Sequence, residues 1–300
     1  MANNRKRKKP NYKGILFLAI IIIIAILFFI NKNQKSQQSP VVTNAQSQNQ
    51  STTSSEIVVE TPETKTSVVS NLSEEEIKKS QERGLPVLMY HFFYDESAGE
   101  TGRDNNCLEI HDFEEQIKYL SENDYYVPTW DEVLGYISGS NGLPLKSVIL
   151  TVDDGDESFF RLAKPVLEKY NFKATSFVIT SWYGNQVSQN QSPSIDFQSH
   201  SDNMHISGSD GKGAFLTIPY EDACTDLQAS RAVLGEQCKV FCYPFGHYND
   251  RCKKILTDCN YTLAFTVKGG RIFPGDDPLE LSRVRISKGE TLNSFISKVK

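Results

Sequence analysis

The sequence lacks the features that define several large classes of protein. Glycine and proline number only 18 and 12 among 300 residues and no internal repeat is evident, which excludes collagen-like and repeat architectures. A basic excess is also missing, because the formal charge is −5 and residues 1–13 alone carry six cations and no acid. The remainder is therefore acidic. Since the phosphates of nucleic acids require a basic face, we expect no nucleic-acid partner.

A doubled Cys-x-x-Cys pattern is absent too, which argues against a zinc–thiolate site. The six cysteines are Cys107, Cys224, Cys238, Cys242, Cys252 and Cys259. Disulfide bonds are the better prediction if this part of the chain lies outside the cell. The pairs closest in sequence are Cys252 with Cys259 and Cys224 with Cys238, but spacing alone does not decide the connectivity.

Residues 14–30 form one long apolar run, GILFLAIIIIIAILFFI, without a charged side chain. With a rise of about 1.5 Å per residue, a helix of this length nearly crosses a hydrocarbon core of about 30 Å. A cleavable secretory signal is the alternative, but such signals have a shorter apolar region and a small-residue cleavage site. We therefore predict an uncleaved transmembrane helix over 14–30, with the basic leader 1–13 in the cytoplasm.

Residues 31–72 are crowded with Gln, Ser, Thr and Asn and show no periodic apolar pattern. Such a segment buries too little apolar surface to offset the cost of ordering its backbone, so we predict a flexible extracellular linker. Ser73 followed by three Glu residues at 74–76 indicates the start of a helix. The predicted folded domain is therefore 73–300, extracellular and held at the cell membrane by a single helix.

The folded domain alternates between strand-like and helix-like segments. The strand-like segments are 85–90, 147–152, 174–180, 195–200, 239–243 and 262–267. The helix-like segments are 112–123 with Asp112 as cap, 159–170, 221–234 and 249–257. This alternation predicts an α/β fold, with a barrel-like sheet favoured over an open one. In such folds, chemistry collects at the carboxyl ends of the strands.

Two groups of polar residues follow strand-like segments. Asp153 and Asp154 come directly after 147–152, and adjacent carboxylates repel each other unless a cation compensates, although Asp-Gly is also an ordinary turn. His200 and His205 converge only if the chain turns between them. Two imidazoles and one carboxylate match a catalytic metal site that keeps a position for water, whereas a surface pair of histidines is the alternative.

Four short motifs occur in a fixed order along the domain. They are LMYH at 88–91, TVDDG at 151–155, HS at 200–201 with a second His five residues after the first, and YPFG at 243–246. In this order they resemble the polysaccharide deacetylases, the NodB-homology carbohydrate esterases, and most closely the poly-N-acetylglucosamine deacetylase branch. The resemblance covers roughly residues 85–290 and implies a distorted (β/α) barrel.

The resemblance also implies a role for each matching residue. Asp154, His200 and His205 match the ligands of a divalent metal ion, most commonly zinc. Asp153 matches the general base, and His91 matches the general acid that this branch takes from its amino-terminal segment. The implied reaction is removal of N-acetyl groups from an N-acetylglucosamine-containing polysaccharide, which releases acetate.

Tyr243 stands where the family uses a backbone N–H to hold the oxyanion, but two features of the family pattern are missing. The Arg that many members place just before the Pro of the third motif is absent, and so is the late Leu-x-His motif. His91 would then be the acid. We hypothesise that Arg283 or Arg285 orients Asp153 in place of the missing Arg.

The expected function is therefore a membrane-anchored extracellular metal-dependent deacetylase whose partner is an acetylated polysaccharide. Two alternatives stay open: an esterase that removes O-acetyl groups from xylan-type polymers, and an inactive wall-binding protein that has kept the barrel. Trp182, which follows the strand-like segment 174–180, is either a platform for a sugar ring or a packing residue. His111 and His247 are expected to be surface residues rather than ligands.

Overall fold

The computed structural model describes residues 68–208 and 211–300. The predicted leader, the predicted transmembrane helix 14–30 and most of the predicted linker lie outside this part of the chain. Within it, no helix combines the length and the apolar character needed to cross a membrane. The last residues of the predicted linker, Val68–Asn71, form a 3-10 turn.

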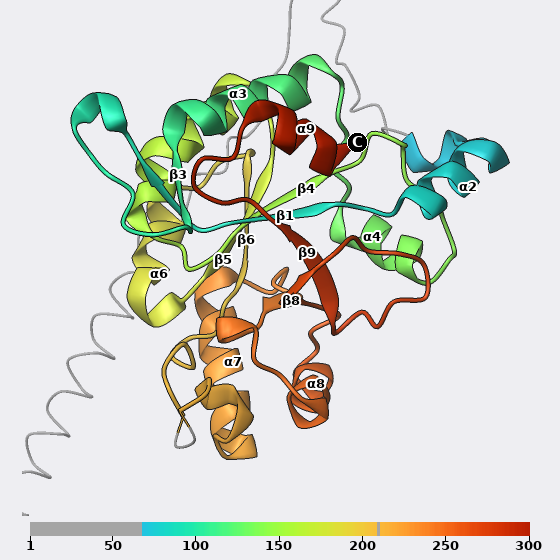
Figure 1. Ribbon diagram of the computed structural model, residues 1–300. Coiled ribbons are helices and arrows are strands. Elements are labelled where there is room, and N and C mark those ends of the chain that lie inside the picture. Colours follow the sequence, from blue (N-terminus) through green and yellow to red (C-terminus); the bar gives the residue numbers. More distant parts are fainter. Residues whose placement is uncertain (1–67, 209–210) are drawn as a thin grey trace, which may run out of the picture. The chain divides into compact units, whose positions relative to one another are not determined.

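Parallel strands close into a barrel in the order β1-β4-β5-β6-β7-β8-β9, with β9 pairing back onto β1 (Figure 1). The barrel strands are β1 (Val87–Tyr90), β4 (Ile149–Val152), β5 (Ala174–Val178), β6 (Ile195–Ser199), β7 (Val240–Cys242), β8 (Leu263–Gly269) and β9 (Leu281–Arg285). A separate pair of parallel strands, β2 (Phe92–Tyr94) and β3 (Cys107–Glu109), lies beyond the end of β1. The predicted α/β barrel is confirmed.

Helices surround the barrel, as expected when strands of a parallel sheet are joined by crossovers. They are α2 (Glu74–Arg83), α3 (Ile110–Glu122), α4 (Trp130–Ile137), α5 (Lys164–Lys169), α6 (Thr180–Gln189), α7 (Tyr220–Leu234), α8 (Asp250–Asp258) and α9 (Leu292–Val299). Helices α3 and α9 lie side by side, and α7 lies beside both α6 and α8 (Figure 1). Helices that are distant in sequence, such as α3 and α9, thus pack side by side in the helical layer that surrounds the sheet.

Local signals explain how several helices begin. Ser73 and Glu76 form the predicted capping box at the start of α2. The predicted cap Asp112 is wrong, because α3 begins at Ile110 and the carboxylate of Glu109 accepts the backbone N–H groups of residues 111 and 112. The predicted helix 159–170 is divided into a π-helical turn, Phe159–Ala163, and α5, since the proline at position 165 has no N–H to continue the ladder.

Strand β4 shows how the barrel prepares a site. Side chains alternate along a strand, and Ile149 belongs to the cluster inside the barrel while Leu150 and Val152 pack outward against the helices. The side chains of Thr151 and Asp153 therefore point into the barrel. Because all strands are parallel, the inward residues at their last positions meet at one end of the barrel.

Candidate active site

All six predicted site residues gather at the carboxyl end of the barrel strands. They line one cavity of about 320 Å³ and are His91, Asp153, Asp154, His200, His205 and Tyr243. Residues 91, 153, 200 and 243 each follow directly after the last residue of a barrel strand. The carboxyl ends of four separate strands thus meet at one cavity, although on β7 the inward side chain is that of Cys242 and Tyr243 packs outward.

Asp154, His200 and His205 form a compact set of potential metal ligands. The Nε2 atoms of His200 and His205 lie 3.5 and 3.6 Å from Oδ1 of Asp154, and one ligand atom from each residue lies within 4.8 Å of the others. Ligands about 2.0–2.1 Å from a tetrahedral ion lie about 3.4 Å from one another. The donor set therefore fits a divalent cation, as the sequence predicts.

The turn that the two histidines require is built into the loop between them. Ser201, directly after His200, has φ of +73°, a left-handed conformation that a serine rarely adopts. The carboxylate of Asp226 on α7 accepts the backbone N–H groups of residues 202 and 203 at 2.8 and 2.7 Å. These bonds offset the strain and return the chain so that His205 faces His200.

Hydrogen bonding also fixes which nitrogen of His200 is available. Nδ1 of His200 lies 2.8 Å from the backbone oxygen of Cys242, and a carbonyl only accepts, so Nδ1 carries the hydrogen and Nε2 faces Asp154. Burial alone would raise the pKa of Asp154, but contact with His200 outweighs it and the pKa lies below its ordinary value. An ionised carboxylate is the state that a cation needs.

Asp153 is held by a buried arginine. Arg283 donates to its two carboxylate oxygens at 2.7 and 2.8 Å, and the arginine is completely buried. Arg283 is itself fixed by the backbone oxygen of Thr266 and by the Thr151 hydroxyl, at 2.9 and 3.1 Å. Burial would raise the pKa of Asp153, but the charge and hydrogen bonds of Arg283 prevail and hold it well below the ordinary value.

This geometry decides between the two arginines considered from the sequence. Arg283 orients Asp153, whereas Arg285 bonds to the side chain of Asn106 at the edge of the cavity. The segment before Pro244 carries no arginine, and the last residue of β7 is Cys242. Its Sγ lies 3.2 Å from Nη2 of Arg283, so β9 supplies the guanidinium that β7 lacks.

A second potential ligand set among the described residues consists of Asp153, His200 and Cys242. It suits a cation less well than the first set, because both carboxylate oxygens of Asp153 already accept bonds from Arg283. The thiol of Cys242 also faces that carboxylate, at 3.5 Å from Oδ2. We therefore assign Asp153 to proton transfer rather than to metal binding.

His91 stands beside Asp153 on the wall of the cavity. Its Nε2 lies 3.7 Å from Oδ2 of Asp153, and its side chain is 16% exposed. Burial lowers the pKa of His91 and outweighs the opposite effect of Asp153. A lowered pKa favours the neutral imidazole, so the role of His91 as general acid stays a prediction.

Tyr243 lines the cavity, but its groups already have partners. The backbone N–H donates to the carbonyl of Phe265 at 3.0 Å, as part of the pairing between β7 and β8, and the phenol donates to the carbonyl of Leu279 at 2.9 Å. An oxyanion would have to share or displace the first of these bonds. The oxyanion role of Tyr243 therefore stays a prediction.

Aromatic side chains border the metal ligands. Trp182 and Phe245 are 50% and 44% exposed, and their rings lie 5.7 and 4.2 Å from the ring of His205. His247 is not a ligand in this set, since its Nδ1 accepts the N–H of Gly213. The cavity is also lined by residues that no motif indicated: Phe92, Asn106, Val267 and Arg285.

The chain is similar to known proteins both in sequence and in fold. Residues 140–264 match the family model described as polysaccharide deacetylase. The poly-β-1,6-N-acetyl-D-glucosamine N-deacetylase of Staphylococcus epidermidis is 27% identical over 200 residues, which cover 61% of this chain and 69% of that protein. The structure of IcaB from Ammonifex degensii has a TM-score of 0.60 and 27% identity over 72% of this chain and 95% of its own. The Streptococcus pyogenes deacetylase PplD, at 24% identity, shares the fold with a TM-score of 0.62 and covers 72% of this chain and 98% of its own. The predicted resemblance to the polysaccharide deacetylases is thus confirmed, with the family model matching residues 140–264.

Proposed function

We propose that this protein is a metal-dependent deacetylase that removes N-acetyl groups from an N-acetylglucosamine-containing polysaccharide. One observation carries the proposal: a buried carboxylate locked by Arg283 stands beside an Asp-His-His ligand set in a single cavity. A barrel kept only for binding would have no need to bury such a charged cluster, because burying charges costs free energy. Similarity to a poly-N-acetylglucosamine deacetylase supports the choice of polymer.

Asp154, His200 and His205 would hold the cation, and their two imidazoles and one carboxylate favour zinc. The ion would polarise the acetyl carbonyl and acidify a water molecule in the cavity. Polarising the carbonyl and acidifying the water both require that the two histidines are neutral and that Asp154 is ionised. The bond from His200 Nδ1 to the Cys242 carbonyl maintains the required tautomer.

The residues around the cation have complementary tasks. Asp153 stays ionised beside Arg283 and accepts a proton from the attacking water, whose oxygen bonds to the acetyl carbon. His91 donates a proton to the departing nitrogen as the C–N bond breaks, since an unprotonated amine is a poor leaving group. The products are acetate and a free glucosaminyl amine. Arg283 acts as a positioning residue because it touches Asp153 and not the substrate.

The exposed aromatic rings suit a polymer of sugars. The rings of Trp182 and Phe245 both lie next to His205, where a sugar unit adjacent to the reacting one could pack against them. Aromatic faces pack against the apolar faces of sugar rings and lose little conformational entropy. We therefore assign Trp182 to substrate binding rather than to packing.

The location is proposed from the sequence. The apolar run 14–30 would anchor the protein in the cell membrane, and the polar segment that follows would let the catalytic domain work outside. A coil of that length reaches about 35 Å on average. This reach suits a substrate in the cell envelope close to the membrane.

The purified full chain should release acetate from N-acetylglucosamine oligomers, and a chelator should abolish this release. The substitution Asp153→Asn should lower kcat/KM by at least about 100-fold, the usual worth of general base catalysis. The matched control is Asp250→Asn, which changes a fully exposed carboxylate on α8. No release from peptidoglycan, chitin-like or poly-N-acetylglucosamine substrates would refute the proposal, and so would full activity in chelator.

A further inference from the structure

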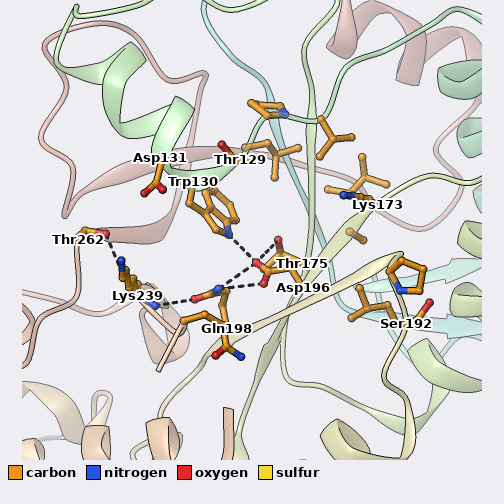
Figure 2. A pocket seen from close by; sticks show the side chains of 18 residues that line it. Thr129, Trp130, Asp131, Lys173, Thr175, Ser192, Asp196, Gln198, Lys239 and Thr262 are labelled. Carbon is orange, nitrogen blue, oxygen red and sulfur yellow. Dashed lines mark hydrogen bonds between the residues drawn. The ribbon is translucent and has the colours of Figure 1, made fainter. Parts of the chain in front are cut away.

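A second cavity, of about 490 Å³, lies at the opposite end of the barrel (Figure 2). It is lined by Ile149, Ala174 and Ile195, the first residues of β4, β5 and β6, and by the start of α4 at Trp130. Because the strands are parallel, their first residues are far from the carboxyl ends that carry the catalytic groups. The two cavities share no lining residue.

Asp196 on β6 contributes an unusual carboxylate to this cavity. Its Oδ2 accepts the indole N–H of Trp130 at 2.7 Å, the amide of Gln198 at 3.1 Å and the hydroxyl of Thr175 at 3.5 Å (Figure 2). All three donors are neutral, and in the described part of the chain no cation forms an ion pair with Asp196. The carboxylate is thus oriented by the protein but keeps acceptor capacity toward the cavity.

Three further charged side chains surround the opening. Lys173, Lys239 and Asp131 line the cavity and are exposed, and none has a side-chain hydrogen bond or ion pair within residues 68–208 and 211–300. In Figure 2, Lys239 and Asp131 lie on one side of Trp130 and Lys173 lies on the other. Donors and acceptors of both charges are therefore available to one ligand.

We propose that this cavity is an auxiliary binding site for a neutral saccharide unit of the polymer substrate. A metal ion is disfavoured because Asp196 is bound by neutral donors, and an anion is disfavoured by the two carboxylates. An apolar ligand would leave the charged side chains desolvated without partners. A sugar satisfies them, since its hydroxyls donate to Asp196 and Asp131 and accept from the lysines, while its apolar face meets Trp130.

The role of the cavity is binding without chemistry, because neither a histidine nor a cysteine lines it. Its volume is in the range of small-ligand pockets, about 300–1,000 Å³. The identity of the sugar rests on the proposed function, whereas the saccharide class rests on the lining. A long polymer that reaches both ends of the barrel would gain affinity through effective concentration, so kcat/KM should rise with chain length.

The sequence offers a direct reporter, because the protein has only two tryptophans and only Trp130 lines this cavity, whereas Trp182 lies beside His205. In the full chain carrying Trp182→Phe and Asp153→Asn, the emission of Trp130 should change saturably on titration with an N-acetylglucosamine pentamer. Adding Lys239→Ala should weaken this binding at least about tenfold, the worth of one hydrogen bond to a charged group. Lys78→Ala, which changes an exposed lysine on α2, is the matched control and should not weaken it.

An unchanged Trp130 emission at concentrations that saturate acetate release by the wild type would overturn the auxiliary site and leave the proposed function intact. Saturable binding together with no acetate release by the wild type would support the site and refute the proposed function instead. If Asp196→Asn, tested in parallel, fails to fold, Lys239→Ala still decides, because that side chain is exposed. Equal affinity in the Lys239→Ala and Lys78→Ala proteins would also overturn the proposal.

Discussion

Replacing Arg283 with Met should show how strongly the carboxylate of Asp153, the proposed general base, depends on one buried cation. The substitution removes both charge-assisted bonds to Asp153 and leaves that carboxylate almost fully buried without a counter-charge. Breaking a buried pair in this way typically costs about 3–5 kcal/mol of unfolding free energy. Met has a similar length, so the loss reflects charge rather than a large cavity.

The loss should depend on pH. In the wild type the folded-state pKa of Asp153 lies below the unfolded value of about 3.9, so the pair stabilises the protein above that pH and its contribution disappears as the pH falls through the folded pKa. In the variant, burial without Arg283 raises the pKa, so ionisation of Asp153 opposes folding as the pH rises. The difference between the two proteins should therefore be largest near pH 7 and smaller near pH 4.

Denaturant unfolding at the two pH values, with a chelator present to remove metal linkage, measures this difference. The double variant Arg283→Met with Asp153→Asn supplies the control, because it replaces the unpaired charge with a neutral amide. It should recover much of the lost stability at pH 7. An equal loss at both pH values, or no recovery in the double variant, would refute the electrostatic explanation.

Other predictions follow from the same structure. The substitution His205→Ala removes one of three donors, so elemental analysis should find zinc far below one equivalent; a full equivalent would contradict the ligand assignment. The substitution Trp182→Ala should raise KM for the polymer about five- to tenfold while kcat changes little, since stacking on an exposed ring is worth about 1–1.5 kcal/mol; an unchanged KM would count against the platform. Oxidised glutathione should cross-link Cys224 and Cys259, whose sulfurs lie 3.3 Å apart, and raise the Tm; peptide mapping that finds another pair would contradict this.

Much of the barrel could be predicted because its strands are continuous apolar runs. Segments such as 147–152 are covered on both faces, so hydrophobicity alone reveals them. The acidic pair after that segment also follows from sequence, since a strand end is where parallel folds place polar groups. The convergence of His200 with His205 depended on a left-handed Ser201, which no local pattern predicts because Gly or Asn is the usual residue there.

Strand β9 escaped prediction for a physical reason. Leu281–Arg285 reads LSRVR, and its inward position at 283 is an arginine, so the segment shows neither a continuous apolar run nor a clean alternation. The arginine is tolerated there because Asp153, 130 residues away in sequence, neutralises it. The cysteine pairs closest in sequence are not the pair that lies in contact. Cys224 on α7 contacts Cys259, which follows α8, because packing between helices brings together residues that are distant in sequence.

The source of the guanidinium that binds Asp153 bears on whether the protein is active. It comes from Arg283 on β9, next to Cys242 on β7. An Arg missing from the third motif would by itself favour the alternative of an inactive wall-binding protein, because Asp153 would lack a partner on β7. The structure removes that support. A buried carboxylate needs a cation that bonds to both of its oxygens, and an arginine on a neighbouring strand can provide it when its side chain points into the barrel. Here β9 supplies it, and the small thiol of Cys242 leaves the space that the guanidinium fills. The charge balance around Asp153 is thus maintained from β9, as the proposed role of this carboxylate as general base requires.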